Sequence, residues 1–376
     1  MLLLTGIITA YLLYLLLEFR AVRSARRSFL HVIHVNGIRG KTGTCRTLDA
    51  VLRTKYRVFT KTTGTDAATI DVDGTEAPIK RLGPASIREQ IRILRRAARE
   101  GAQILIVECM AVNPDLQAVA QDSIVRGDIS VITNVRYDHI LDMGETREEI
   151  ASSLSAVIPE NGILVTAEPE GERFFGDICR ARGTELVLCP SAGDASDNVG
   201  IARAIAGRLD IGEDLFAEAL SGIHEDFGVS RLYEVAGPEG VRYHFLNLFS
   251  VNDPMSTESN LQNALGDLGG PGKTPLFFLY NHRPDRPDRA LLFSRHFFPN
   301  YTETPLFLMG PGLPLPRRLF RNAGVKDIRV IRGPGKREAA PWVFPSLPEG
   351  ALLVGIGNIK GPAYTLIEQL NRGADL

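Results

Sequence analysis

The stretch HVNGIRGKTGT at residues 34–44 decides how this chain folds. It overlaps the apolar run HVIHV at 31–35, which is typical of a buried strand, and it precedes Cys45–Leu52, which we predict to be a helix. Glycines between a strand and a helix let backbone N–H groups close on phosphate oxygens, and the helix amino terminus adds a positive dipole. We therefore predict a phosphate-binding loop, although Gly37 and Gly40 are closer together than the glycines of the common motif.

The residue types in this loop suit ATP and Mg²⁺. Lys41 supplies a positive charge for the β and γ phosphates, and the hydroxyl of Thr42 is a ligand type that Mg²⁺ accepts. The predicted nucleotide-binding residues of the loop are Asn36, Gly37, Ile38, Arg39, Gly40, Lys41, Thr42, Gly43 and Thr44.

Beyond the loop, short β-rich runs alternate with helical stretches. The runs ILIVE at 104–108, ISVIT at 129–133 and ILVT at 163–166 are predicted strands, and Ser86–Glu100 is a predicted amphipathic helix. This alternation indicates a parallel α/β sheet. We interpret the arginines of the helix as a solvated outer face, with contact to lipid as the alternative.

A second α/β block follows. Its predicted strands are PLFFLY at 275–280, PLFLM at 305–309, IRVI at 328–331 and ALLVGIG at 351–357. The predicted boundary between the blocks lies near Gly228. We expect an anchor at residues 1–20, an ATP-binding domain at 29–228 and a smaller α/β domain at 229–376.

The amino terminus carries a membrane signal. Met1–Leu17 has no charged residue and is followed by Arg20, Arg23, Arg26 and Arg27. At about 1.5 Å per residue such a helix is roughly 26 Å long, just short of a ~30 Å hydrocarbon core. A cleaved signal peptide would have the opposite charge order, and the other alternative is a helix buried in the fold. We predict a single-pass anchor in the cell membrane, with the rest of the chain in the cytoplasm.

The overall composition excludes some classes of protein. The formal net charge of the 376 residues is -1, whereas nucleic-acid binders concentrate positive charge, so nucleic acid is not an expected partner. The four cysteines form no CxxC pair, which fits a reducing cytoplasm. We interpret Cys45 and Cys109 as small packing residues.

Several motifs resemble the Mur ligase superfamily in their residues and order. HVNGIRGKTGT resembles its phosphate loop, and Glu108 at the end of ILIVE resembles its magnesium-binding glutamate. Thr133-Asn134-Val135 with Asp138-His139 is similar to its Asn-x-x-x-Asp-His motif, whose histidine contacts a second metal. The resemblance thus implies Thr42, Glu108 and His139 as metal ligands, with a helix cap as the alternative role of Glu108.

Less specific motifs of the same superfamily follow later in the chain. The segment 197–207, which includes Asn198, is similar to the helix that contributes to the adenine pocket. Ser230-Arg231 with Glu234 resembles the junction that opens the carboxy-terminal domain, and Asn252-Asp253-Pro254 resembles the Asn-Pro loop of that domain.

The run NHRPDR at 281–286 loosely resembles the Asp-Arg loop of the superfamily. Its Arg283 and Arg286 could clamp a transferring phosphoryl group, and a solvated charge run is the alternative. The residues with an implied catalytic role are Lys41, Glu108, His139, Arg283 and Arg286, and Asn198 and Arg231 join the implied nucleotide site.

Two differences from other members of the superfamily limit which of its families this chain resembles. Peptidoglycan-precursor ligases begin with a domain that binds a uridine nucleotide, and only a helix precedes the loop here. The stretch from Arg81 to Gly272 contains no lysine, so the carbamylated lysine of many relatives has no counterpart at its usual place. The apolar helix, its basic flank and the loop together look like the ATP-binding ligase subunits of poly-γ-glutamate synthase, the PgsB or CapB family.

That resemblance implies a membrane ligase whose substrates are glutamate and a growing poly-γ-glutamate chain. ATP would activate a carboxylate as an acyl phosphate, which an amine then attacks. The implied partners are the membrane subunits of a polymer synthase and export complex, and membrane lipid. The alternatives are a ligase or amidating subunit acting on a lipid-linked precursor, and a coupling ATPase of a membrane exporter.

Overall fold

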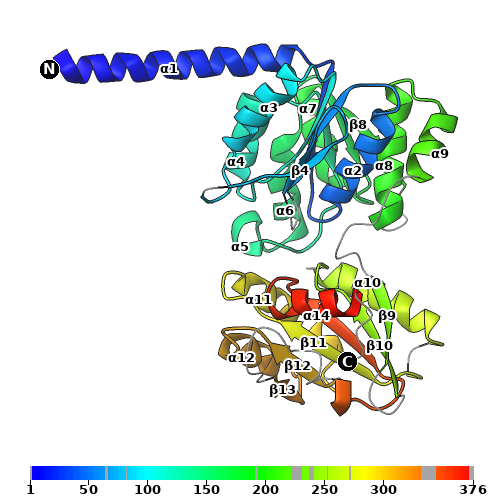
Figure 1. Cartoon of the computed structure of the whole chain (residues 1–376). Helices are drawn as coiled ribbons and strands as arrows, with labels where there is room; N and C mark the ends of the chain where they lie inside the picture. Colours follow the sequence, from blue (N-terminus) through cyan, green and yellow to red (C-terminus); the bar gives the residue numbers. More distant parts are fainter. Residues whose placement is uncertain are drawn as a thin grey trace. The chain divides into compact units, whose positions relative to one another are not determined.

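The computed structural model describes residues 2–63, 67–81, 83–190, 194–221, 231–236, 241–251, 253–270, 272–331 and 344–371. The chain divides into two compact units (Figure 1). Unit 1 comprises Met1–Arg136 and Asp142–His224, and unit 2 comprises Tyr137–Leu141 and Glu225–Leu376. The predicted boundary at Gly228 lies outside the described residues.

Unit 1 is built on an eight-stranded sheet with the order β4-β3-β2-β5-β1-β6-β7-β8. The strands are β1 (His31–Asn36), β2 (Val58–Lys61), β3 (Ala68–Ile70), β4 (Glu76–Pro78), β5 (Ile104–Glu108), β6 (Ile129–Ile132), β7 (Ile163–Thr166) and β8 (Glu185–Leu188). All neighbouring strands pair in parallel except β2 with β3 and β3 with β4. The predicted parallel α/β fold is therefore confirmed, with a short antiparallel edge added to it.

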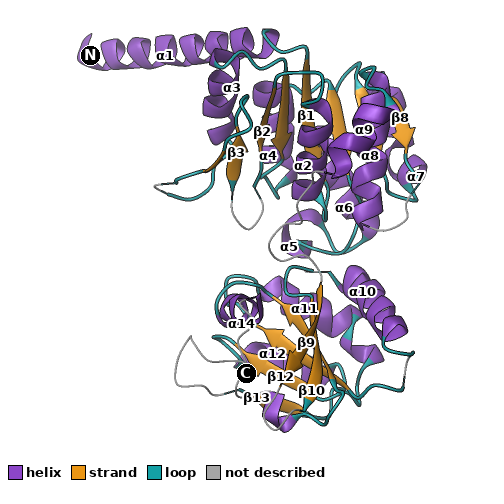
Figure 2. Cartoon of the chain, turned by 45° about the vertical axis from the view of Figure 1, so that its right-hand side comes forward, coloured by secondary structure: helices purple, strands orange, loops and turns teal. Residues whose placement is uncertain are grey.

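Helices cover both faces of this sheet (Figure 2). The helical elements of unit 1 are α1 (Leu2–Arg27), α2 (Lys41–Leu52), α3 (Glu89–Arg99), α4 (Pro114–Val119), the π-helical turn η1 (Ala120–Val125), α6 (Arg147–Leu154), the 3-10 turn η2 (Ser155–Val157), α7 (Gly171–Arg182), α8 (Asp194–Arg208) and α9 (Glu213–Ser221). The short helix α5 (Ile140–Met143) has residues in both units. Side chains alternate across a strand, so Ile33 and Val35 of β1 pack with α2 and α8, whereas Val32 packs with α3 on the opposite face. This alternation gives the unit two apolar layers.

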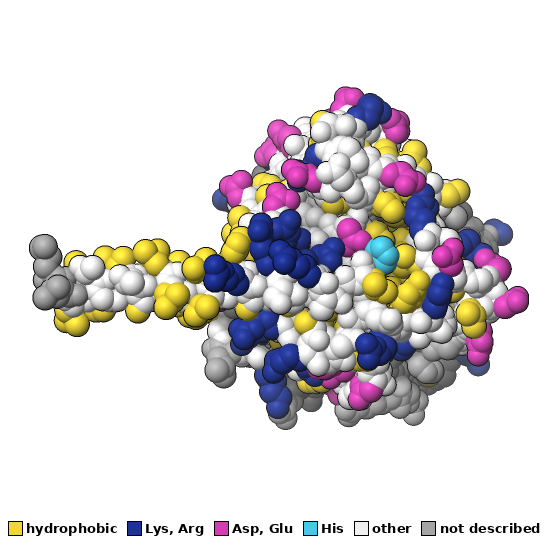
Figure 3. Space-filling model, turned by 90° about the horizontal axis from the view of Figure 1, so that it is seen from above, with side chains coloured by type: hydrophobic (Ala, Val, Ile, Leu, Met, Phe, Trp, Pro, Cys, Tyr) yellow, Lys and Arg dark blue, Asp and Glu magenta, His cyan; other side chains and the backbone are white. Residues whose placement is uncertain are grey.

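Helix α1 leaves unit 1 at its amino-terminal end. Val22 and Ala25 are buried in the layer that contains α3, and Glu18 forms an ion pair with Arg88 (2.7 Å), so the last turns of α1 belong to the fold. Among the described residues, one helix is long and apolar enough to cross a membrane; it spans Leu3–Arg27 and has a mean hydropathy of 1.5. None of its apolar window is buried. Figure 3 shows yellow apolar side chains along its projecting part.

Unit 2 contains a six-stranded sheet with the order β13-β12-β11-β14-β10-β9. Its strands are β9 (Arg231–Ala236), β10 (Arg242–Asn247), β11 (Leu276–Asn281), β12 (Leu306–Met309), β13 (Ile328–Val330) and β14 (Leu352–Gly357). Its helices are α10 (Pro254–Asp267), α11 (Pro287–His296), α12 (Pro314–Asn322) and α14 (Pro362–Asn371), with 3-10 turns η4 (Phe298–Asn300) and η5 (Phe344–Ser346). Only the edge strand β9 runs antiparallel to its neighbour.

Two apolar layers enclose this second sheet. One contains side chains of α10, α11 and α12, and the other contains side chains of α14. The four apolar runs predicted as strands form β11, β12, β13 and β14. The carboxyl end of β11 carries the polar run that begins at Asn281.

Candidate functional site

The glycine loop, residues Gly37–Gly40, joins the carboxyl end of β1 to the amino terminus of α2. Gly37 has a φ of 122°, and a Cβ at this position would lie 2.1 Å from the hydroxyl oxygen of Thr133. A side chain is therefore excluded by both the backbone conformation and the contact. The loop passes directly against the segment that follows β6.

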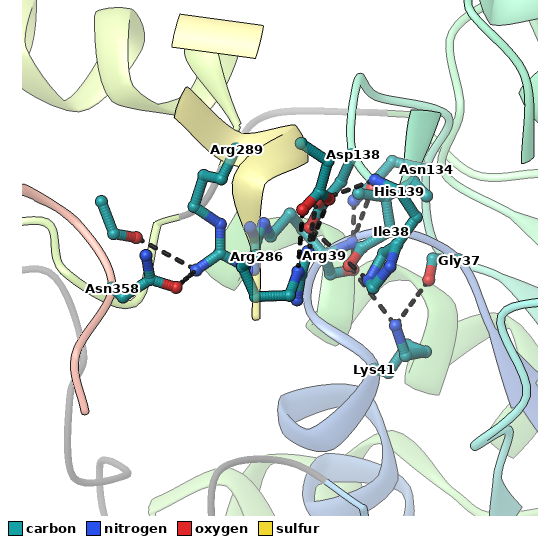
Figure 4. Close-up of polar contacts among 12 residues, drawn as sticks. Gly37, Ile38, Arg39, Lys41, Asn134, Asp138, His139, Arg286, Arg289 and Asn358 are labelled. Carbon is teal, nitrogen blue, oxygen red and sulfur yellow. Dashed lines mark hydrogen bonds and ion pairs between the residues drawn. The ribbon is translucent and has the colours of Figure 1, made fainter. Parts of the chain in front are cut away.

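Hydrogen bonds to that segment hold the loop in place. The backbone N–H of Arg39 donates to Asn134 Oδ1 (3.0 Å), and that of Ile38 donates to the carbonyl of Asn134 (3.3 Å). The carbonyl of Arg39 accepts from the hydroxyl of Thr133 (2.5 Å) and from the amide of Asn134 (3.2 Å). Figure 4 shows Asn134 beside Ile38 and Arg39. The motif Thr133-Asn134 thus shapes the loop.

The loop leads into a helix that begins earlier than we predicted. Gly40 adopts the left-handed conformation (φ 78°), and the 12-residue helix α2 begins at Lys41. Lys41 and Thr42 consequently lie in its first turn, where unpaired N–H groups and the helix dipole favour an anion. Lys41 Nζ donates to the carbonyls of Gly37 (2.7 Å) and Ile38 (3.4 Å), so its charge lies over the loop (Figure 4).

Four further predicted residues lie beside the loop. The hydroxyl of Thr44 donates to Asn198 Oδ1 (2.6 Å), so α8 contributes Asn198 to this region as predicted. A Cβ at Gly43 would lie 2.6 Å from Asn198 Nδ2, which shows how closely α8 approaches α2. Asn36 is buried, and its amide donates to Gln117 Oε1 (2.7 Å), so its side chain supports the end of β1 from within the fold.

Glu108 ends β5, the strand adjacent to β1, and is only 2% exposed. Its Oε2 accepts a hydrogen bond from the hydroxyl of Thr42 (3.0 Å) and one from the backbone N–H of Thr63 (2.7 Å). A carboxylate and a hydroxyl this close are the hard oxygen ligands that Mg²⁺ takes alongside phosphate oxygens. The two residues that we predicted as magnesium ligands are therefore neighbours in the structure, and the donor set fits the ion.

A buried lysine lies behind this pair. Lys61 at the end of β2 has no exposed side-chain surface and forms an ion pair with Glu89 (3.2 Å), which also pairs with Arg81 (2.7 Å). Burial lowers the pKa of Lys61, while the charges of Glu89 and Glu108 oppose that effect. Lys61 thus adds positive charge close to the carboxylate of Glu108. We did not predict this residue, because a lone lysine at the end of the short run VFTK carries no signal.

The two cysteines near the loop are buried. Burial raises the pKa of the Cys109 thiol to about 11 and that of Cys45 well above its ordinary value. A thiolate nucleophile needs a lowered pKa, so both fit the predicted role of packing residues.

A second polar cluster lies in unit 2. One ligand atom from each of Asp138, His139 and Asp288 lies within 4.8 Å of the others, an arrangement that could hold a metal ion. His139 has a φ of 52°, an uncommon backbone conformation for a non-glycine residue. Arg286 pairs with Asp138 (2.9 Å) and Asp288 (3.2 Å), and these carboxylates hold its pKa above the ordinary value against the effect of burial (Figure 4).

His139 and Arg286 are predicted site residues, and Asp138 belongs to the predicted Asp-His motif. The structure places all three together. Asp288 is an addition. It lies in the first turn of α11, and the only sequence signal for it was the charged run after β11.

The other predicted site residues of unit 2 contact residues near them in the sequence. Arg283 pairs with the nearby Asp285 (Nε to Oδ1, 3.0 Å), as expected of a solvated charge run. Arg231 is exposed at the start of β9 and lies over the ring of Tyr233 (5.1 Å). Their proposed roles stay predictions. Ser230 and Asn252 lie outside the described residues, and Asp253 caps α10 by accepting from the N–H of Ser256 (2.8 Å).

Comparisons with known proteins agree with this geometry. Residues 35–177 match the Mur ligase middle domain, and residues 232–373 match the poly-gamma-glutamate synthase CapB C-terminal domain. The chain is 32% identical to the capsule biosynthesis protein CapB of Bacillus anthracis, covering 98% of this chain and 83% of that one. It is 31% identical to the PGA synthase CapB of Bacillus subtilis (strain 168), covering 90% of each.

Solved structures show the same fold at low identity. A bifunctional folylpolyglutamate synthase/dihydrofolate synthase, solved with Mn, AMPPNP and L-glutamate bound, superposes with a TM-score of 0.63 at 14% identity over 93% of each chain. Together, the parallel sheet, the glycine loop, the match to the Mur ligase middle domain and the two CapB relatives define an ATP-dependent amide ligase of the Mur ligase type. Within that class, the chain belongs to the CapB family of poly-γ-glutamate synthases.

Proposed function

We propose that this chain uses Mg-ATP to join glutamate residues through γ-linked amide bonds. The observation that carries the proposal is the pairing of Thr42 with Glu108 at 3.0 Å, directly beside the glycine loop at the amino terminus of α2. This arrangement offers backbone donors and a lysine for phosphates, and hard oxygen ligands for a divalent cation. The names of the two CapB relatives support the polymer as the product.

The proposed reaction has two steps. A carboxylate oxygen of one substrate attacks the γ-phosphorus of ATP, the bond from that phosphorus to the β–γ bridging oxygen breaks, and ADP leaves. The amine of the second substrate then attacks the acyl phosphate, phosphate departs, and the amine loses a proton. Phosphoryl transfer depends mainly on positioning and charge neutralisation, so Lys41 neutralises the β and γ phosphates, and Mg²⁺ held by Thr42 and Glu108 would withdraw charge from them.

Other residues have supporting roles in this proposal. Asn198 helps bind the nucleotide, since it already contacts Thr44 beside the loop. The cluster in unit 2 would hold a second metal ion through His139, and the positive charge of Arg286 balances the negative charge of Asp138. Arg231 contributes to nucleotide binding, and Arg283 and Arg286 stabilise the transferred phosphoryl group.

We further propose that the substrates are free glutamate and the end of a growing γ-linked chain. The folylpolyglutamate synthase of the same fold was solved with L-glutamate bound, which supports glutamate as an amine donor. A lipid-linked precursor remains the alternative acceptor. The exposed apolar part of α1 favours a membrane anchor, and the ligase would work with membrane subunits that extend or export the chain.

Trapping the acyl phosphate tests the proposal. The full chain, purified in a neutral detergent, is incubated with Mg-ATP, glutamate and a short γ-linked glutamate acceptor, and hydroxylamine is added. We expect a hydroxamate of the carboxylate substrate and ADP release that requires the carboxylate. Rapid ADP release without any carboxylate, and without a hydroxamate, would instead identify a coupling ATPase and overturn the ligase assignment.

A further inference from the structure

A basic pocket lies where α1 joins unit 1. It has a volume of about 570 Å³, and the last turns of α1 and the chain after η1 form its walls. Its lining includes four arginines: Arg23, Arg26, Arg27 and Arg126. Figure 3 shows dark blue side chains gathered at the base of the projecting helix. None of the residues proposed for ATP, metal or catalysis lines this pocket.

Each acidic residue of the pocket has a basic partner. Asp128 accepts hydrogen bonds from Arg26 (2.7 Å), His31 (2.6 Å) and the N–H of Val32 (2.7 Å). The other two carboxylates of the lining both lie near the guanidinium of Arg182. Asp122 is 3.2 Å from it, and Glu160 is 4.0 Å from it. Arg26 and Arg182 balance two of these three carboxylates, so one negative charge is left against the three remaining arginines of the lining.

The remaining arginines carry uncompensated positive charge. Arg23, Arg27 and Arg126 are exposed, and within the described ranges no carboxylate pairs with any of them. The guanidinium of Arg23 lies over the ring of Phe19 (4.4 Å). Arg26 donates to the carbonyl of Arg126 (2.7 Å), and its charge is repelled by that of the Arg126 guanidinium. An anion in the pocket would relieve this repulsion and accept several charge-assisted hydrogen bonds.

The position of the pocket along α1 indicates which kind of anion binds in it. Glu18 is fixed to Arg88 at the start of α3, so only the helix before Glu18 projects from the fold. Leu2–Leu17 is about 24 Å long at ~1.5 Å per residue, less than a ~30 Å hydrocarbon core, so the membrane surface must approach unit 1 closely. Arg23 lies about 9 Å along the helix from Leu17. That places the pocket at the level of lipid headgroups.

We propose that this pocket binds the phosphate headgroup of an anionic phospholipid. The proposal rests on the proposed membrane anchor. Exposed apolar side chains of α1, such as Leu16 and Leu17, lie immediately before the basic turns, so the acyl chains of the lipid can lie along the helix while its phosphate contacts the arginines. A soluble phosphate or a polycarboxylate has no apolar part to use this continuity.

Short-chain lipids test the proposal with the full chain in a neutral detergent. We titrate dihexanoyl phosphatidylglycerol by calorimetry and compare it with dihexanoyl phosphatidylcholine, inorganic phosphate and a γ-linked glutamate polymer. The parent should bind phosphatidylglycerol in clear preference to the other three. The double variant Arg27→Gln/Arg126→Gln should bind it roughly 30-fold more weakly, because each arginine near an anionic headgroup is worth about a fivefold change in affinity.

Two further variants control for charge. Arg27→Lys/Arg126→Lys keeps the charge and should retain most of the affinity. Arg317→Gln/Arg318→Gln removes two exposed arginines of α12 and should bind like the parent. Equal binding by the parent and the Arg27→Gln/Arg126→Gln variant would overturn the proposal. So would inorganic phosphate or the polymer binding as tightly as the lipid, which would show a general anion site.

Two more measurements separate this proposal from those on which it depends. Flotation of the parent with neutral phosphatidylcholine vesicles tests the anchor alone, and a parent that fails to float refutes both the anchor and the lipid pocket. Mg-ATP binding tests the ligase site, and we expect no change in it for any of the arginine variants. Loss of lipid preference with flotation and ATP binding intact would refute the pocket only.

Discussion

Replacing Glu108 by glutamine removes one negative charge from the candidate magnesium site and almost no volume. The carboxylate is 2% exposed, and its Oε2 accepts the hydrogen bonds from Thr42 and Thr63. The amide oxygen of glutamine can accept both bonds. The variant therefore separates the charge of Glu108 from its packing.

The expected effects on folding and on activity differ in size. Two charge-assisted hydrogen bonds become neutral ones, which costs about 1–2 kcal/mol of the free energy of unfolding. Loss of a charged ligand to Mg²⁺ should cost about 3–4 kcal/mol in the transition state, or roughly 200- to 1,000-fold in kcat/KM. The activity loss should thus far exceed any loss of stability.

The assay is glutamate-dependent ADP release across a range of Mg²⁺ concentrations, with urea unfolding measured in parallel. We expect partial recovery of Glu108→Gln at high Mg²⁺, because the remaining ligand, Thr42, binds the ion weakly. Glu172→Gln, the same change at an exposed position of α7, is the matched control and should behave like the parent. A Glu108→Gln variant with the Mg²⁺ dependence of the parent would show that Glu108 is structural.

The remaining predictions concern the loop, the anchor and the buried ion pair. Lys41→Ala should lower ATP turnover by at least about 100-fold with an unchanged melting curve, since a half-buried loop lysine adds little to the core; near-normal ADP release would remove the phosphate-loop assignment. Deletion of Met1–Leu17 should leave a soluble protein that binds Mg-ATP while polymer yield in cells falls, because tethering raises effective concentration; an insoluble protein without ATP binding would place α1 in the core. Glu89→Gln should destabilise the fold by about 3 kcal/mol at about pH 7, because it leaves Lys61 buried beside a neutral partner. The pKa of Glu89 is lowered from 4.5 in the folded state, so this contribution is present above that value and is lost as the pH falls below it. The two unfolding free energies should approach each other as the pH falls from 4.5 through the lowered pKa of Glu89 in the folded state, and a constant difference would contradict the assignment.

Strands made of continuous apolar runs could be predicted from the sequence, and short or polar strands could not. β5 is five buried residues of an apolar run, which is typical of a parallel strand covered on both faces. By contrast, β3 and β4 have three residues each, and β4 is largely exposed. β9 mixes charged and apolar side chains at an edge. Such short or polar segments become strands because a neighbour offers hydrogen bonds, which a local pattern does not reveal.

Some contacts of the candidate site could likewise be predicted from the sequence, and others could not. Thr42 and Glu108 could be predicted as neighbours, because the carboxyl ends of adjacent parallel strands share one edge of the sheet. The contact of Arg286 with Asp138 joins residues 148 positions apart, and no sequence pattern distinguishes Arg286 from Arg283. The N–H of Thr63 at Glu108 is a backbone donor, so no residue type could indicate it.

The hydrogen bonds that hold the glycine loop have a thermodynamic consequence. Fixing the backbone of one free residue costs roughly 1–2 kcal/mol, and residues 37–39 are already fixed by Thr133 and Asn134. A triphosphate that binds there does not have to order the loop, so more of its contact energy appears as affinity. Because the backbone of the loop is fixed, the loop should bind anions whose shape matches its existing conformation. Selectivity for the triphosphate would then depend on the rigidity of the loop as much as on its charge. The backbone amides of the loop should be protected from hydrogen exchange before any nucleotide binds.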